Sequence, residues 1–178
     1  MSVTKKWPLV VIIVFVIVSM AFAVGCGGSK SETASSTSSG GNESKETVAE
    51  AKVKGEIYDT EKFSILAPDG WNKMDIPGGV QLYQGNDVLQ VAVSGSNITE
   101  EDDKALLEDM SKQYNGTPLE EVSMFGMKFF KISFTASGSD QTMYSGVRNG
   151  EQVIIQVAGK DHANNETIKA MLESIKLK

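Results

Sequence analysis

Apolar and polar residues alternate in three short runs, and a period of two is typical of a β-strand that buries one face. The runs cover residues 62–68 (KFSILAP), 80–84 (VQLYQ) and 87–95 (DVLQVAVSG). A turn signal, Pro68-Asp69-Gly70, ends the first run. We expect Trp71, directly after this turn, to be a core anchor. The runs therefore predict three strands before residue 96.

The spacing of apolar residues changes to three and four after residue 98, which predicts an α-helix from Glu100 to Tyr114. Thr99 is the expected N-cap, and Asp102, three residues further on, completes a variant of the capping box. We expect Asn115-Gly116 to end the helix. The apolar stripe of this helix consists of Leu106, Leu107, Met110 and Tyr114.

Four further strands are predicted after this helix. Residues 119–126 and 127–137 form a pair that is hinged at Phe125-Gly126. Asn149-Gly150 stands between two alternating runs and is the strongest hairpin signal in the chain, a type I′ turn. The cross-strand pairs that this turn predicts are Arg148–Glu151, Tyr144–Ile155 and Gly146–Val153. Both faces of this hairpin carry apolar residues, so we expect cover on both sides of the sheet.

Residues 164–178 (NNETIKAMLESIKLK) predict a second helix, which Asn164 or Asn165 caps. Its buried stripe is expected to consist of Ile168, Met171, Leu172 and Ile175. The order of strands, helix, four strands and helix contains no regular βαβ repeat. The predicted fold class is therefore α+β, a mostly antiparallel β-sheet with helices packed on its faces.

The one long apolar run lies near the N-terminus, where residues 7–25 carry no charge and follow Lys5 and Lys6. A positive segment, an apolar segment and small residues, in this order, are typical of an export signal. The run also approaches the roughly 20 residues that span a bilayer. Two interpretations follow: an uncleaved single-span anchor, or the signal peptide of a lipoprotein.

Residues 23–26 (AVGC) resemble the lipobox of bacterial lipoproteins, in which small or aliphatic residues precede a cysteine. The resemblance favours the lipoprotein; it implies a diacylglyceryl group on the Cys26 sulfur and cleavage between Gly25 and Cys26. Gly, Ser and Thr dominate the residues that follow, as in a flexible tether. We thus expect attachment to the cell membrane at its extracytoplasmic face. The predicted segments are a signal peptide (1–25), the lipidated cysteine with its tether (26–54) and a folded domain (55–178).

Charge and composition restrict the classes of function. The 178 residues include 17 Lys and Arg against 23 Asp and Glu, a net charge of −6, which argues against nucleic-acid binding. A single cysteine cannot form an internal disulfide or a thiolate zinc site. The sequence also lacks the glycine-rich nucleotide-binding motifs and the nucleophile elbow of hydrolases.

Two features suggest chemistry at first sight. His162, the only histidine, lies in the polar stretch GKDHANNE, and we interpret it as a solvated loop residue. Four consecutive carboxylates at residues 100–103 point in different directions on a helix. We interpret them as first-turn acids stabilised by the helix dipole rather than as a calcium site. We therefore expect no catalytic residue, no metal site and no cofactor.

Several segments share the order and pattern of a known family. They are FSILAPDGW (63–71), Gly126 with MKFFKISF, the strand around Tyr144, and GEQVIIQVAG followed by LESIKL. Across residues 57–177 the chain resembles the PsbP-like (Mog/PsbP) superfamily, which includes the DcrB-like bacterial lipoproteins. The resemblance implies a sheet sandwiched by helices, an αβα arrangement. It also implies a non-catalytic accessory or assembly factor that binds a larger partner.

The sequence thus predicts a membrane-anchored lipoprotein that acts as a non-catalytic accessory or protein-interaction domain with an unidentified protein partner. The alternative is a lipoprotein that binds a small solute or lipid in a pocket between the sheet and a helix. An exposed apolar patch would favour the first function. An apolar cavity with a few inward polar groups would favour the second.

Overall fold

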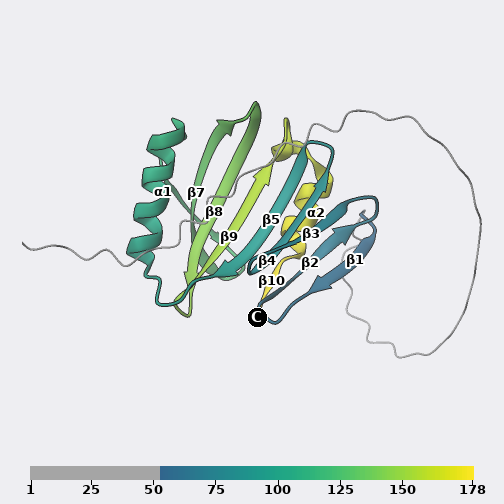
Figure 1. Ribbon diagram of the computed structural model, residues 1–178, viewed down its shortest axis with the longest axis horizontal. Helices are drawn as coiled ribbons and strands as arrows, with labels where there is room; N and C mark the ends of the chain where they lie inside the picture. Colours follow the sequence, from purple (N-terminus) through teal and green to yellow (C-terminus); the bar gives the residue numbers. More distant parts are fainter. Residues whose placement is uncertain (1–52) are drawn as a thin grey trace, which may run out of the picture. The chain divides into compact units, whose positions relative to one another are not determined.

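The computed structural model describes residues 53–178, and within this range the chain forms ten β-strands, two α-helices and one 3₁₀ helix (Figure 1). The strands are β1 (Gly55–Asp59), β2 (Phe63–Pro68), β3 (Asn72–Ile76), β4 (Gly79–Gln84), β5 (Asp87–Ser94), β6 (Glu120–Met124), β7 (Met127–Ala136), β8 (Ser139–Arg148), β9 (Glu151–Ala158) and β10 (Lys176–Leu177). The helices are α1 (Glu100–Tyr114), η1 (His162–Asn164) and α2 (Glu166–Ser174). The signal peptide, the Gly25–Cys26 cleavage site and nearly all of the tether lie outside the described residues.

Two antiparallel sheets organise these strands. The larger sheet has seven strands in the order β3-β4-β5-β9-β8-β7-β6, and the smaller has three in the order β1-β2-β10. Short hairpins join β3 to β4 and β4 to β5, and likewise β6 to β7, β7 to β8 and β8 to β9. The two groups of strands meet where β5 pairs with β9. The α+β class and the mostly antiparallel sheet are therefore confirmed. No helix within residues 53–178 has the length and apolar character that a membrane span requires.

The central strands of the large sheet bury apolar side chains on both faces. On one face, Phe129 of β7 packs in a core cluster that includes Ile168 and Met171 of α2 and residues of β2. On the other, Phe130 and its neighbours on β7 pack with Leu107 of α1 in a second cluster. Residues 129 and 130 point to opposite faces because successive side chains alternate across a strand. Both faces of the sheet are therefore covered by other elements, as the apolar residues on both faces of the β8–β9 hairpin predict.

The predicted hairpins form with the predicted registers. Arg148 pairs with Glu151 across the β8–β9 turn, and Tyr144 pairs with Ile155 further along the same strands. Asn149 and Gly150 both adopt positive φ, 53° and 77°, as a type I′ turn requires. Such angles cost little for Gly or Asn, which is why this dipeptide fixes the register so well.

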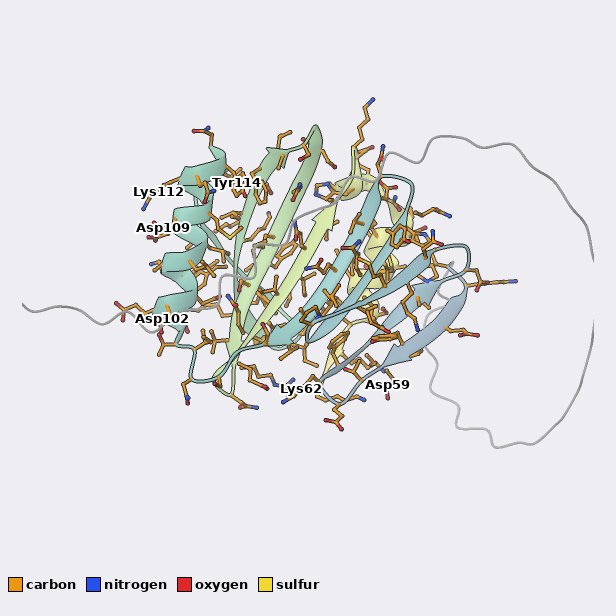
Figure 2. The ribbon with its side chains drawn as sticks, viewed as in Figure 1. Asp59, Lys62, Asp102, Asp109, Lys112 and Tyr114 are labelled. Carbon is orange, nitrogen blue, oxygen red and sulfur yellow. The ribbon has the colours of Figure 1, made fainter. Side chains whose placement is uncertain are left out.

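Helix α1 begins and ends where the sequence predicts. The Thr99 side chain accepts a hydrogen bond from the Asp102 backbone N–H at 3.1 Å, and the Asp102 carboxylate accepts one from the Thr99 N–H at 3.3 Å. Asn115 ends the helix in the left-handed conformation. Figure 2 shows Asp102 at one end of the helix and Lys112 and Tyr114 near the other. Of the predicted stripe, Leu107 is fully buried, whereas Tyr114 remains 39% exposed.

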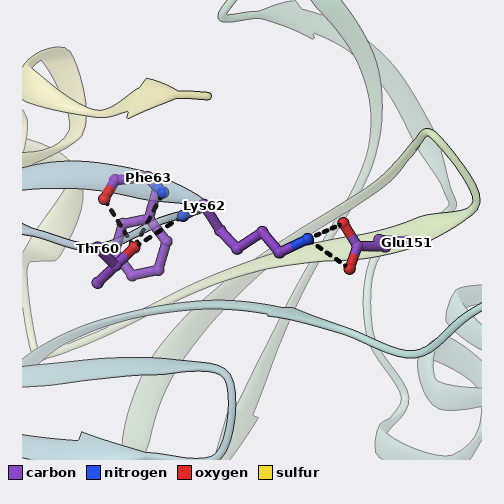
Figure 3. A network of polar contacts seen from close by, with 4 residues as sticks. All are labelled: Thr60, Lys62, Phe63 and Glu151. Carbon is purple, nitrogen blue, oxygen red and sulfur yellow. Dashed lines mark hydrogen bonds and ion pairs between the residues drawn. The ribbon is translucent and has the colours of Figure 1, made fainter.

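An ion pair joins the two sheets, next to hydrogen bonds within the β1–β2 turn (Figure 3). Lys62 Nζ, in the turn between β1 and β2, lies 3.0 and 2.9 Å from the two carboxylate oxygens of Glu151 in β9. Thr60 Oγ1 accepts hydrogen bonds from the backbone N–H groups of Lys62 and Phe63, which order this turn. Because both charged groups are solvent-accessible, the ion pair contributes little stability and serves mainly to fix geometry.

Two sequence-based predictions need correction, and three strands were missed. The last helix ends at Ser174, and Ile175 is extended, because the residues after it pair with β2 as strand β10. Trp71 is only half-buried against the core instead of anchoring it. The missed strands are β1, β3 and β10. Strands β1 and β3 are mostly exposed edge strands with polar sequences, so backbone pairing rather than side-chain alternation defines them.

The burial of Phe129 and of Trp71 predicts different losses of folding stability when each side chain is truncated to alanine. Phe129→Ala should lower the free energy of unfolding by about 3–5 kcal/mol, because the ring is fully buried. Trp71→Ala should cost less than about 3 kcal/mol, because the indole is only partly buried. Urea unfolding followed by circular dichroism measures both, and a larger loss for Trp71→Ala would contradict the assignment.

Candidate functional site

A cleft of about 310 Å³ opens between the large sheet and the segment formed by η1 and α2. Strands β7, β8 and β9 supply one side of its lining, and the two helices supply the other. The cleft continues the sheet face that is buried at Phe129, at the point where the strand residues on that face become polar. The lining residues are Lys131, Ser133, Thr142, Tyr144, Val157, His162, Ala163, Ile168, Lys169 and Leu172.

A chain of hydrogen bonds runs along the cleft. Ser133 Oγ lies 3.0 Å from Thr142 Oγ1, which lies 2.9 Å from His162 Nε2. His162 Nδ1 lies 3.2 Å from the Gly159 carbonyl oxygen. A carbonyl can only accept, so Nδ1 carries the proton in this contact and, in the neutral ring, Nε2 accepts from the Thr142 hydroxyl. Thr142 in turn accepts from Ser133.

The interpretation of His162 as a solvated loop residue is therefore wrong. The residue belongs to a 3₁₀ helix, is half-buried, and is held in one orientation by Thr142 and Gly159. No local signal in the polar stretch around His162 indicates this contact, because Thr142 lies 20 residues earlier in the chain. The arrangement places an ordered imidazole and hydroxyl in the lining of the cleft.

Two lysines give the cleft its charge. Lys131 Nζ lies 2.9 Å from a carboxylate oxygen of Glu120, and Lys169 Nζ lies 2.9 Å from one of Glu166. The hydrogen bond to Glu120 raises the pKa of Lys131 despite partial desolvation, so this ammonium stays charged at neutral pH. Burial raises the pKa of Tyr144, although Lys131 opposes the shift. The phenol therefore stays protonated and can donate a hydrogen bond.

A buried carboxyl lies on the opposite face of the sheet, beneath α1. Asp103 is only 1% exposed. Its Oδ1 accepts hydrogen bonds from Ser145 Oγ at 2.5 Å and from Gln152 Nε2 at 2.6 Å. Its Oδ2 is buried without a hydrogen-bond partner among the described residues. Burial raises the pKa of this carboxyl, and the hydrogen bonds from Ser145 and Gln152 lower it only in part.

The four acidic residues at the start of α1 thus have different roles. Asp102 belongs to the capping box and Glu100 forms an ion pair with Lys128, which agrees with the interpretation of them as first-turn acids. Asp103 differs, because it points into the interior and contacts β8 and β9. Within residues 53–178, no group of three or more His, Cys, Asp or Glu side chains is placed to hold a metal ion.

A second candidate site is the tip of the β6–β7 hairpin, which we define as Met124, Phe125, Gly126 and Met127. Phe125 and Gly126 form a two-residue turn with φ of 53° and 74°. The Met and Phe side chains of the tip pack on the edge of the core and are partly buried. The Phe125 ring meets the Phe129 ring edge-on, with centroids 6.0 Å apart. The tip therefore leaves only part of these flexible and aromatic side chains accessible to solvent.

Comparison with known proteins identifies a solved structure with a similar fold. No protein-family model and no curated protein matches the chain. The solution structure of cyanobacterial PsbP (CyanoP) from Synechocystis sp. PCC 6803 is similar, with a TM-score of 0.50 and 13% identity over 76% of this chain and 98% of that one. A structure from Bacteroides thetaiotaomicron VPI-5482 gives a TM-score of 0.49 and 12% identity, over 70% of this chain and 48% of its own. The likeness to CyanoP shows that the chain has a PsbP-like fold.

The buried carboxyl predicts a pH-dependent stability. The pKa of Asp103 is higher in the folded chain than its ordinary value of 3.8, so the folded state binds this proton more tightly than the unfolded state. The stability that the protonated form contributes is complete below about pH 3.8 and is lost as pH rises through the folded pKa. Relative to wild type, Asp103→Asn should therefore become progressively more stable as pH increases from 4 to 7.

Urea unfolding at several pH values measures this difference, and only its dependence on pH is used, since the amide also changes the buried hydrogen bonds. Asp109→Asn is the matched control, because Asp109 is exposed on the same helix (Figure 2). A difference for Asp103→Asn that stays as flat as that of the control would contradict the raised pKa.

Proposed function

We propose that this protein is a lipoprotein anchored at the extracytoplasmic face of the cell membrane, whose domain acts as a non-catalytic accessory module for a protein partner. The lipobox-like residues that end at Cys26 support the anchor. The PsbP-like fold supports the accessory role, since the family resemblance of the sequence implies factors of that kind. We place the interaction surface at the β6–β7 tip, and the observation that supports this choice is the backbone conformation of the tip.

Phe125 occupies a position at which a bulky side chain is unfavourable. The left-handed conformation costs a residue other than Gly, Asn or Asp roughly 1–2 kcal/mol. Three hairpins of the large sheet have positive φ at both turn residues, and the first of these residues is Asn149, Ser137 or Phe125. Two of the hairpins thus place a small polar residue there, and one places an aromatic ring. Strain that the fold tolerates at a partly exposed, apolar tip favours a role in recognition.

Methionine and aromatic side chains suit such a role. Met adapts its shape to a partner surface because it is unbranched and flexible, and aromatic residues are enriched at the centres of protein interfaces. The tip stands at the edge of the sheet, where strand β6 has no further strand beside it among the described residues. A partner could therefore approach it without displacing any described element.

A second candidate function is binding of a small solute or lipid in the cleft beside α2. The observation that favours it is the lining, which combines apolar side chains of α2 with an ordered hydroxyl–imidazole chain. Small-molecule sites usually combine a mostly apolar wall with a few fixed polar groups. The two functions are compatible, since the cleft and the hairpin tip use different side chains.

The proposed lipid anchor predicts that the protein incorporates labelled fatty acid only if the Cys26 sulfur is present. Wild-type chain expressed in a bacterium with radiolabelled palmitate should incorporate the label, and Cys26→Ala should lose nearly all of it, because the sulfur is the acceptor for the diacylglyceryl group. Fluorography of the immunoprecipitated protein measures the label. Equal incorporation in both chains would exclude lipidation at Cys26 and return the uncleaved single-span anchor to consideration.

If the tip binds a partner, a substitution at Phe125 should weaken partner binding without lowering the stability of the fold. Phe125→Asn relieves the backbone strain but removes the edge contact with Phe129, which is worth about 0.5–1.5 kcal/mol. The free energy of unfolding should therefore stay within about 1 kcal/mol of wild type. A photoreactive amino acid at position 124 should crosslink a discrete partner in intact cells, and Phe125→Asn in the same chain should reduce this product at least several-fold.

The matched control is Ile57→Asn, which removes an apolar side chain that is 62% exposed on β1. It should leave crosslinking from position 124 unchanged. If Phe125→Asn and Ile57→Asn gave equal yields, or if no discrete product formed, the tip would not be the interaction surface.

A further inference from the structure

The charged side chains that line the cleft beside α2 are all lysines, although the protein is acidic. Its ten lining residues include two lysines and no Asp or Glu, although the chain as a whole carries a net charge of −6. Both lysines pair with carboxylates that lie outside the lining, Glu120 and Glu166. These exposed pairs are weak, and an ammonium has three donors, so each lysine can still bind a second anion.

The polar groups of the cleft favour a ligand that accepts hydrogen bonds. In the hydroxyl chain, Ser133 donates to Thr142 and Thr142 donates to His162 Nε2, so the acceptor capacity of the imidazole is used internally. The Tyr144 phenol, next to Lys131 across the β7–β8 pair, is a further donor. A cation would find two ammonium groups and no carboxylate in the lining, whereas an anion would find donors on both the sheet side and the helix side.

The rest of the lining is apolar. Val157 of β9 and Ile168 of α2 are almost completely buried, and Leu172 lies one helical turn further along the same face of α2. These side chains form a continuous extension of the main core, to which all three belong or pack. Leu172 is the one of the three that is partly exposed; a free inorganic anion would leave it in contact with water, whereas an anion with an apolar body would cover it.

We propose that the cleft binds a small organic carboxylate with an apolar body. Lys131 and Lys169 bind the carboxylate from opposite sides, together with the Tyr144 hydroxyl. The apolar body packs on Leu172 and Ala163, the apolar side chains of the lining that are accessible. A volume of about 310 Å³ is at the lower end of small-molecule sites, so the ligand is compact. This inference rests on the second candidate function, solute binding in the cleft, and names the class of solute.

Benzoate and benzamide are suitable probes, because they share an aromatic body and differ in charge. The full chain, reconstituted in phosphatidylcholine nanodiscs, is titrated with each probe by isothermal titration calorimetry, with empty nanodiscs as the blank. Benzoate should bind about tenfold more tightly than benzamide, since charge-assisted hydrogen bonds are about twice as strong as neutral ones. Lys169→Gln and Lys131→Gln should each weaken benzoate binding roughly tenfold and leave benzamide binding unchanged.

Lys160→Gln is the matched control, because it removes the same charge from an exposed residue near the cleft that is not part of its lining; it should leave both affinities unchanged. Tyr144→Phe, which removes a single donor and keeps the ring, tests the site if a lysine variant fails to fold. Equal binding of benzoate and benzamide would overturn the preference for an anion and leave solute binding intact. Binding of neither probe would overturn the inference and the second candidate function together, without bearing on the accessory role of the hairpin tip.

Discussion

The burial of both faces of the large sheet is the constraint on which the remaining structure depends. Phe129 and Phe130 are consecutive residues of one strand, yet each is buried in a different core cluster. A strand of this kind is stable only if apolar elements cover both sides of the sheet. Helix α1 therefore packs on one face, and α2 with the small sheet packs on the other, so the place of each helix follows from the side-chain pattern of β7 to β9.

The same constraint explains why a cleft exists. On the face that contains Phe129, apolar residues of β7 and β8 give way to Lys131, Ser133 and Thr142, which a helix cannot cover without burying polar groups. Helix α2 therefore covers the apolar part. In the polar part, Lys131 and Ser133 stay partly exposed. Thr142 is buried with a hydrogen bond to His162. The cleft forms at this boundary, where the strands supply hydrogen-bonding groups and the helix supplies apolar side chains.

Beneath α1 the buried surface includes a polar contact of a different kind. Asp103 is tied to β8 and β9 by Ser145 and Gln152, which fixes the rotation of the helix about its axis. The cost is a carboxyl group with one buried oxygen that has no partner among the described residues. A buried polar atom without a partner lowers the stability of the fold.

Local sequence determined the elements whose interactions lie within a few residues. The capping box at Thr99, the Asn149-Gly150 turn and the helical spacing of Leu107 each involve neighbours in the chain, and each was predicted with its correct position. Lipobox-like residues before Cys26 are likewise a local pattern. The α+β class followed from the order of these elements, because that order excludes a regular βαβ repeat.

Only the tertiary structure decided which of the remaining residues matter. Strand β10 forms because residues near the C-terminus pair with β2, more than a hundred residues away in sequence, and this pairing overrides the tendency of the segment to continue a helix. His162 joins the cleft through Thr142, and Asp103 becomes buried through Ser145, 42 residues away. Burial and hydrogen bonding depend on what the fold brings into contact, and local residue patterns carry no information about partners that distant.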